Sequence, residues 1–181
     1  MIWLMFYLFF LAVAAGFGAL AAWSDIKGMT IPNLHSAVIL GAFPLAYMAA
    51  WLAGADVFYA PLSHLISFGI VFVISAAFFY FRIMGAADSK LASAYALWMG
   101  LPGLAPFLFY MTLMGAVLGI ATLVLKRRKP LTAPPAGSWM DQAQKGADKV
   151  PYGVAIVFGA FVSFVVLGYV GSEALASFVQ S

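Results

Sequence analysis

Long apolar runs constrain this chain more than any other feature. No charged residue lies between Met1 and Asp25, and uncharged runs follow at about 31–53, 62–81 and 104–125. A helix needs about 20 apolar residues to cross the roughly 30 Å hydrocarbon core of a bilayer. A water-soluble domain has about 25% charged residues, whereas this chain has 8%, with 65% hydrophobic residues and a mean hydropathy of +1.03. The sequence therefore predicts an integral membrane protein.

The apolar runs predict one membrane-embedded domain over residues 1–181, an all-α bundle of about six transmembrane helices. The expected spans are about 2–23, 31–53, 62–81, 89–101, 104–125 and 150–170, with a basic loop at 126–149 before the last helix. The fourth segment is short for a full crossing. It requires a thin bilayer or an end that opens to water.

The basic residues predict the orientation of the bundle. All nine Lys and Arg residues fall in three alternate loops, at 24–30, 82–90 and 126–149, whereas the opposite loops hold Asp56 and Glu173 and no basic residue. Basic loops remain on the cytoplasmic side, so we expect the N-terminus outside. The first run lacks a basic start and is too long for the core of a signal peptide, so we expect it to be a membrane anchor.

Two aspartates lie where predicted spans meet short inner loops: Asp25 in SDIK and Asp88 in AADSK. An ionisable group at a span boundary is costly, and it points to a function. Two carboxylates that meet can share one proton, hold a water molecule, and act as base and acid in peptide hydrolysis. Alternatively, each aspartate caps a helix or pairs with its neighbouring lysine. The residues alone leave both interpretations open.

Lys27 and Lys90 each follow one of these aspartates by two residues. Residues two apart on a helix point to opposite sides, which favours lysines that anchor the helix at the headgroups over catalytic partners. The chain has no cysteine, which excludes a disulfide, a thiolate nucleophile and a zinc–cysteine site. His35 and His64 fall on opposite predicted sides of the membrane. We therefore expect no metal site. We also expect no cofactor and no nucleic-acid partner.

Three segments carry a resemblance to a known family. SDIKGMTIPN at 24–33 resembles the first aspartate motif of the type IV prepilin peptidases, and GAAD at 85–88, followed by SKL, resembles their Gly-x-Gly-Asp motif. KVPYGVAI at 149–156 resembles a segment typical of the short branch that processes Flp-type pilins of tight-adherence systems. The three matches come in order and extend over nearly the whole chain.

The resemblance implies an intramembrane aspartyl endopeptidase of the GxGD type. Such enzymes remove the short basic leader peptide from prepilins at the cytoplasmic face of the bacterial inner membrane. Larger members add an N-methyltransferase domain with a cysteine cluster. This chain has no cysteine, so we expect peptidase activity without methylation. The implied partners are the prepilin, the lipid bilayer and other pilus assembly proteins.

The resemblance also implies roles for individual residues. Asp25 and Asp88 match the two catalytic aspartates. The implied active-site loop comprises Gly85, Ala86, Ala87 and Lys90, and the implied supporting residues are Lys27, Pro32, Asn33 and Tyr152.

Ala87 stands where the family motif has its second glycine. If that position requires a positive φ, alanine costs about 1 kcal/mol; otherwise the position is ordinary backbone.

Two other functions remain open from the sequence. In the first, the protein is a non-enzymatic transporter or assembly subunit in which Asp25 and Asp88 carry ions or pair with partner helices. In the second, it is a related preflagellin-type peptidase. Substitution of single aspartates discriminates the first from a prepilin peptidase, and genomic neighbours would discriminate the second.

Overall fold

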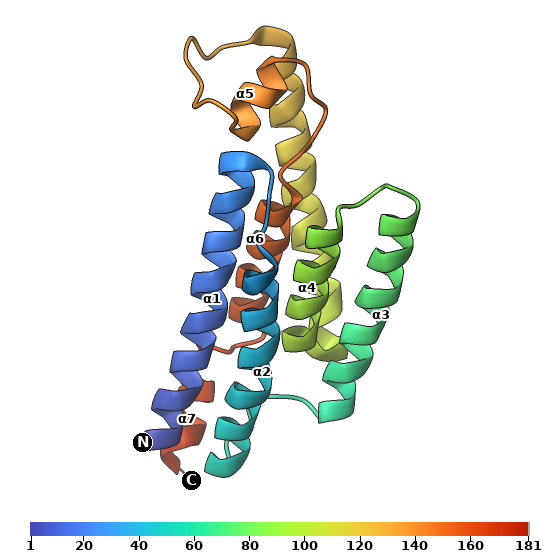
Figure 1. Cartoon of the computed structure of the whole chain (residues 1–181). Helices are drawn as coiled ribbons and strands as arrows, with labels where there is room; N and C mark the ends of the chain where they lie inside the picture. The colour runs from blue at the N-terminus through green and yellow to red at the C-terminus, as the bar shows by residue number, and fades with distance from the viewer. Residues whose placement is uncertain (181) are drawn as a thin grey trace.

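The computed structural model describes residues 1–180, and every regular element in that range is a helix (Figure 1). The helices are α1 (Ile2–Gly28), α2 (Asn33–Ala53), α3 (Pro61–Tyr80), α4 (Ala86–Arg128), α5 (Trp139–Gln144), α6 (Tyr152–Val166) and α7 (Ser172–Gln180). α4 packs against α3 and α6, and α1 packs against α2 and α6.

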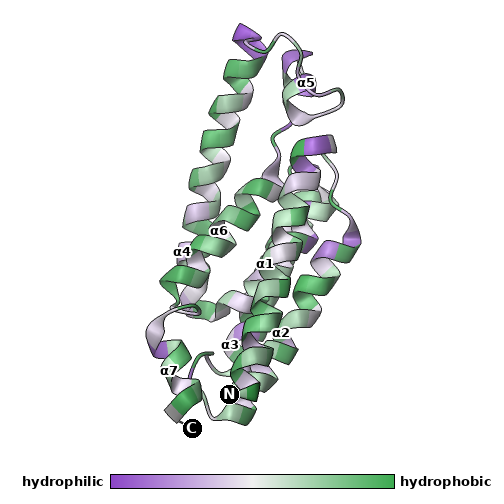
Figure 2. Ribbon diagram, turned by 90° about the vertical axis from the view of Figure 1, so that its left-hand side faces the viewer, coloured by the Kyte–Doolittle hydropathy of each residue, from purple (hydrophilic) through white to green (hydrophobic). Residues whose placement is uncertain are grey.

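The helix lengths and compositions suit a membrane. α1, α2, α3 and α4 are each long and apolar enough to span a bilayer, and α6 is a shorter apolar helix of 15 residues. Figure 2 shows hydrophobic residues covering these helices, with hydrophilic residues gathered toward the helix ends. The prediction of an all-α membrane bundle is confirmed.

α4 contains both the short segment expected at 89–101 and the full-length span expected at 104–125. Its helical geometry is interrupted at Gly100, where φ is 61° and ψ is 175°, a conformation open almost only to glycine. The chain reverses direction there, so the first part of α4, green in Figure 1, runs antiparallel to the second part. The sequence placed this break at Pro102-Gly103, two residues later.

Side chains of α3 satisfy backbone groups around the break. His64 Nδ1 donates to the Leu97 carbonyl at 2.8 Å, and Ser67 Oγ donates to the Ala96 carbonyl at 2.7 Å. Ser63 Oγ accepts from the N–H of Leu101 at 2.9 Å. Backbone groups inside a membrane protein need such partners because lipid supplies none.

The loop expected at 126–149 is shorter and partly helical. α4 continues to Arg128, and α5 begins after Ser138, whose hydroxyl accepts from the N–H of Asp141 at 3.3 Å. A serine at this position is a common helix start. The expected span at 150–170 is also shorter: α6 ends at Val166, and α7 is a separate helix.

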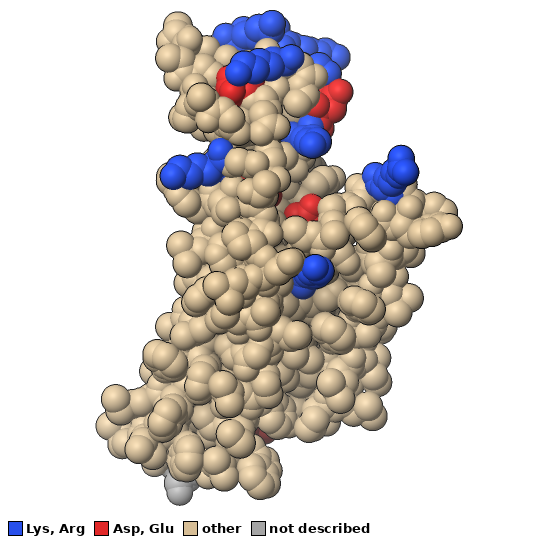
Figure 3. All heavy atoms as spheres, viewed as in Figure 1, with Lys and Arg blue, Asp and Glu red and all other residues tan. Residues whose placement is uncertain are grey.

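The basic loops lie toward one end of the bundle, opposite the start of α1 and the end of α7. The loops at 29–32, 81–85 and 129–151 lie at one end, the upper end in Figure 1, and the start of α1 and the end of α7 lie toward the other. Figure 3 shows the visible Lys and Arg side chains from the top of the molecule down to about mid-height and none toward the lower end. The three basic loops of the sequence therefore lie toward the same end of the molecule.

Hydrogen bonds from two buried aromatic side chains connect the helices that carry the two aspartates to their neighbours. Tyr95 of α4 donates its hydroxyl to the Ala14 carbonyl of α1 at 2.9 Å, and Trp98 Nε1 donates to the Ile39 carbonyl of α2 at 2.9 Å. Both rings are fully buried, and a buried ring of this kind normally finds a partner for its polar atom. These bonds tie α4 directly to α1 and α2.

Candidate active site

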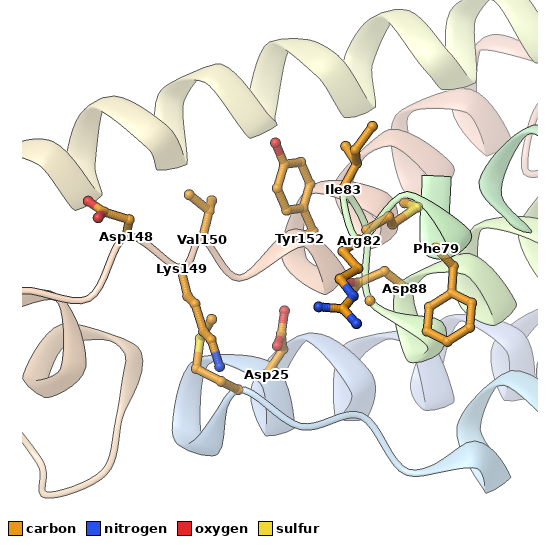
Figure 4. Close-up of a pocket in the computed structure, with 12 residues that line it drawn as sticks. Asp25, Phe79, Arg82, Ile83, Asp88, Asp148, Lys149, Val150 and Tyr152 are labelled. Atoms are coloured by element: carbon orange, nitrogen blue, oxygen red, sulfur yellow. The ribbon is translucent and has the colours of Figure 1, made fainter. Parts of the chain in front are cut away.

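Asp25 and Asp88 line the same cavity at the basic end of the bundle (Figure 4). Asp25 lies in the last turn of α1, and Asp88 lies in the first turn of α4. The cavity has a volume of about 600 Å³. The lining residues are Asp25, Met29, Phe79, Arg82, Ile83, Met84, Gly85, Asp88, Asp148, Lys149, Val150 and Tyr152. Helix packing thus brings together two carboxylates that are far apart in sequence.

Asp25 is buried, with 5% of its surface exposed. Its Oδ2 accepts a hydrogen bond of 2.8 Å from the backbone N–H of Gly153. Gly153 lies in the first turn of α6, where backbone N–H groups have no acceptor within their own helix. The start of α6 therefore supplies a donor for which the Asp25 carboxylate is the acceptor.

Asp88 is half-buried and lies three residues after Gly85, the residue that precedes the first turn of α4. Its carboxylate lies directly against the Gly85 backbone, since a β-carbon at Gly85 would be 2.8 Å from Asp88 Oδ2. A carboxylate in the first turn of a helix also interacts favourably with the helix dipole. Local helix geometry therefore contributes to holding Asp88 at the cavity.

Ala87 lies in ordinary helical backbone. In the described chain, the residues other than glycine with positive φ are Met29, Arg82 and Lys129. The position therefore does not require the conformational freedom of glycine. In the connection between α3 and α4, the left-handed conformation falls at Arg82, where φ is 59°.

The structure places the expected site residues in two groups. Gly85 and Tyr152 line the cavity with the two aspartates. Lys27, Pro32, Asn33, Ala86, Ala87 and Lys90 are not among its lining residues. Lys90 Nζ instead donates to Asn33 Oδ1 at 3.0 Å, which links α4 to α2. Pro32 directly precedes the first residue of α2.

Several residues at the site were not expected from the sequence, and three of them bear on its charge or geometry. Arg82 and Lys149 line the cavity, and Figure 4 shows the Arg82 side chain pointing into it. Gly153 is the third, through its backbone N–H. Lys149 and Gly153 both fall within the segment KVPYGVAI at 149–156, whose resemblance was their signal in the sequence but assigned them no role.

The arrangement is suited to acid–base chemistry on a peptide bond. Two carboxylates that share a cavity favour a state in which one holds a proton and the other does not, and such a pair can activate water and protonate a leaving amine. Within residues 1–180, no group of three or more His, Cys, Asp or Glu side chains could hold a metal ion. We assign no metal ligand.

Comparison with known proteins gives one family. The sequence model of the Type IV leader peptidase family matches residues 3–120, a range that includes Asp25 and Asp88. No curated protein and no solved structure gives a significant match. The apolar helices indicate a multi-pass membrane protein, and the family match implies aspartic-type leader peptidase activity in general. Since the match spans more than half of the chain, this protein belongs to the type IV leader peptidase family.

Proposed function

We propose that this protein is an intramembrane aspartyl endopeptidase that removes the leader peptide from a type IV prepilin, with Asp25 and Asp88 as its catalytic pair. The observation that carries the proposal is the single cavity that both carboxylates line. The family match supports leader-peptidase activity in general. Among the family members, the Flp-type branch is favoured by the segment Lys149–Ile156.

The proposed reaction needs only water and the two side chains. One carboxylate takes a proton from a water molecule as the water oxygen attacks the scissile carbonyl carbon. The other, initially protonated, gives its proton to the amide nitrogen as the C–N bond breaks. The products are a new carboxyl group on the leader and a new amine on the mature pilin. The two residues thus exchange protonation states in one turnover.

The cavity is lined by charged residues of both signs: Asp25, Asp88 and Asp148 are acidic, and Arg82 and Lys149 are basic. Asp148 is already paired with Lys126 at 2.6 Å, and a shared proton leaves one of the other two aspartates neutral, so the proposal of a basic leader rests on the family resemblance. The chain has no cysteine, so it lacks the cysteine cluster of the methyltransferase domain found in larger relatives. Peptidase activity without N-methylation is therefore part of the proposal.

The decisive test is cleavage of a candidate Flp-type prepilin by membranes that carry this protein, read by mass. Asp25→Asn and Asp88→Asn should each abolish cleavage, and the double variant should be no worse than either single variant because the pair acts as a unit. Asp56→Asn is the matched control, since Asp56 is exposed and lines a pocket with Glu173 away from the site. Substantial cleavage by either single variant would exclude the pair. Cleavage of a preflagellin but not of the prepilin would favour a preflagellin-type peptidase.

The proposed location is the bacterial inner membrane, with the cavity at the cytoplasmic face. A cysteine introduced at Ala136 should resist an impermeant maleimide in intact cells, whereas one at Ser172 should react. Both positions are exposed, and the native chain has no cysteine. The reverse labelling pattern would place the cavity on the wrong side for a cytoplasmic leader.

A further inference from the structure

The first turn of α6 meets the last turn of α1 at Gly153. Its N–H donates to Asp25 Oδ2 at 2.8 Å, across 128 positions of sequence. An N–H group can only donate, so Oδ2 presents a lone pair to it. The carbonyl oxygen of a protonated carboxyl is a better acceptor than its hydroxyl oxygen, so this bond favours Oδ1 as the site of any proton that Asp25 carries. The bond thus biases which oxygen of Asp25 exchanges protons.

Gly153 also leaves no room for a side chain. A β-carbon at this position would lie 2.6 Å from Ile31 Cδ1, 2.9 Å from Asp25 Oδ2 and 3.3 Å from Asp25 Cβ. Contacts below 3.0 Å essentially do not occur between real atoms of this kind. Gly153, Ile31 and Asp25 are all buried, which limits the room for adjustment.

We infer that Gly153 is a positioning residue for Asp25, an inference that rests on the proposed catalytic role of that carboxylate. Its N–H orients the carboxylate, and its missing side chain lets the backbone of α6 approach closely enough to donate. Gly153 lies beyond the matched range of 3–120. A part of the chain outside the family match thus sets the geometry of a residue inside it.

The two contacts of the added β-carbon can be separated by a second substitution. Ile31→Val removes Cδ1, the atom nearest to the added carbon, and leaves the carboxylate in place. Gly153→Ala should lower kcat for the prepilin at least tenfold while KM stays within about twofold, because a small displacement of a reacting group is costly. Ile31→Val should stay within about twofold of the wild type. The double variant Gly153→Ala, Ile31→Val should remain as slow as Gly153→Ala.

Recovery of the double variant to the rate of Ile31→Val would overturn the inference, because the defect would then be packing against Ile31. Wild-type kcat in Gly153→Ala would overturn it too. If Gly153→Ala alone fails to insert, the double variant, which lacks the nearest overlap, is compared with Ile31→Val, and equal kcat values overturn the inference.

A thermal unfolding cycle tests the contact without relying on activity. The wild type, Gly153→Ala, Asp25→Ala and their double variant are unfolded in detergent. Gly153→Ala should lower Tm less in the Asp25→Ala background, where the carboxylate no longer occupies the space, than in the wild type. Additive changes in Tm would overturn the contact. If the wild type cleaves no prepilin, the proposed function fails, while this cycle still decides whether Gly153 holds the Asp25 side chain.

Discussion

Gly85 lies directly against the carboxylate of Asp88: a β-carbon at Gly85 would sit 2.8 Å from Asp88 Oδ2. The backbone of Gly85 is extended, with φ −71° and ψ 148°, which any residue can adopt. The glycine is therefore needed for space beside the carboxylate rather than for an unusual backbone conformation.

Gly85→Ala should lower prepilin cleavage by about tenfold. The added methyl group displaces the Asp88 carboxylate, and a displacement of about 1 Å can cost up to roughly a hundredfold in rate. Gly41→Ala in α2 is the matched control, since a β-carbon there has nothing within 4 Å. The measurement is the cleavage rate at equal amounts of inserted protein. Wild-type cleavage by Gly85→Ala would show that Asp88 can turn aside without loss.

Ala87→Gly should leave the cleavage rate within about threefold of the wild type. Ala87 has no positive φ to relieve, so glycine gains nothing at the site. Glycine should instead cost up to about 1 kcal/mol of stability in the first turn of α4. Both quantities are measured, by prepilin cleavage and by thermal unfolding. A rate increase of tenfold or more would mean that the methyl group of Ala87 hinders the substrate.

The sequence was sufficient to bring the two aspartates to one end of the molecule. Apolar runs located the helices, and the loop positions of the nine basic residues placed Asp25 and Asp88 on a common side. The structure then places both in one cavity. Long apolar segments carry a strong signal because a bilayer allows few alternatives for the backbone.

Details that depend on tertiary contacts could not be predicted in the same way. Pro102 indicated a break nearby, but the helix breaks at Gly100, where φ is positive. Hydrogen bonds with the side chains of Ser63 and His64 surround that break. Gly153 acts through a backbone N–H, which leaves no side-chain signal, and its partner Asp25 lies 128 positions away.

Asp141 should make the segment around α5 sensitive to acid. Its Oδ2 accepts from Lys145 Nζ at 2.8 Å and from the N–H of Gly137 at 2.9 Å. The bond from Lys145 and then the bond from Gly137 lower the pKa of Asp141 below its ordinary value of 3.8. A lowered pKa stabilises the folded segment above pH 3.8, and that stabilisation is lost as the pH falls through the lower folded-state pKa.

A buried reporter can follow this transition. A cysteine at Ala143, which is fully buried, should react slowly with a pyridyl disulfide from neutral pH down to about pH 4 and rapidly below it. Lys145→Ala should move the onset of rapid reaction to higher pH, because it removes the larger contribution to the low pKa of Asp141. An onset unchanged by Lys145→Ala would show that this bond does not hold the segment.

Gly100→Ala should destabilise the protein by about 1–3 kcal/mol, the usual cost of forcing a side chain into such a conformation. A β-carbon at Gly100 would also lie 3.2 Å from Tyr59 Cδ2 and 3.3 Å from both His64 Cε1 and Ser63 Oγ. Those neighbours include two of the three α3 residues that bond the chain around the break. The substitution thus strains the backbone and its supports together, which should reduce Tm and the amount of inserted protein.

Gly119→Ala separates this effect from the loss of a glycine as such. Gly119 lies in the same helix α4, has no positive φ, and a β-carbon there has nothing within 4 Å. Alanine in regular helix should therefore be neutral or stabilising by up to about 1 kcal/mol. Thermal unfolding of the two variants side by side gives the comparison. If Gly100→Ala unfolds at the same temperature as Gly119→Ala, the reversal of α4 does not depend on the glycine conformation, and the contacts of α4 with its neighbouring helices must hold its two parts antiparallel.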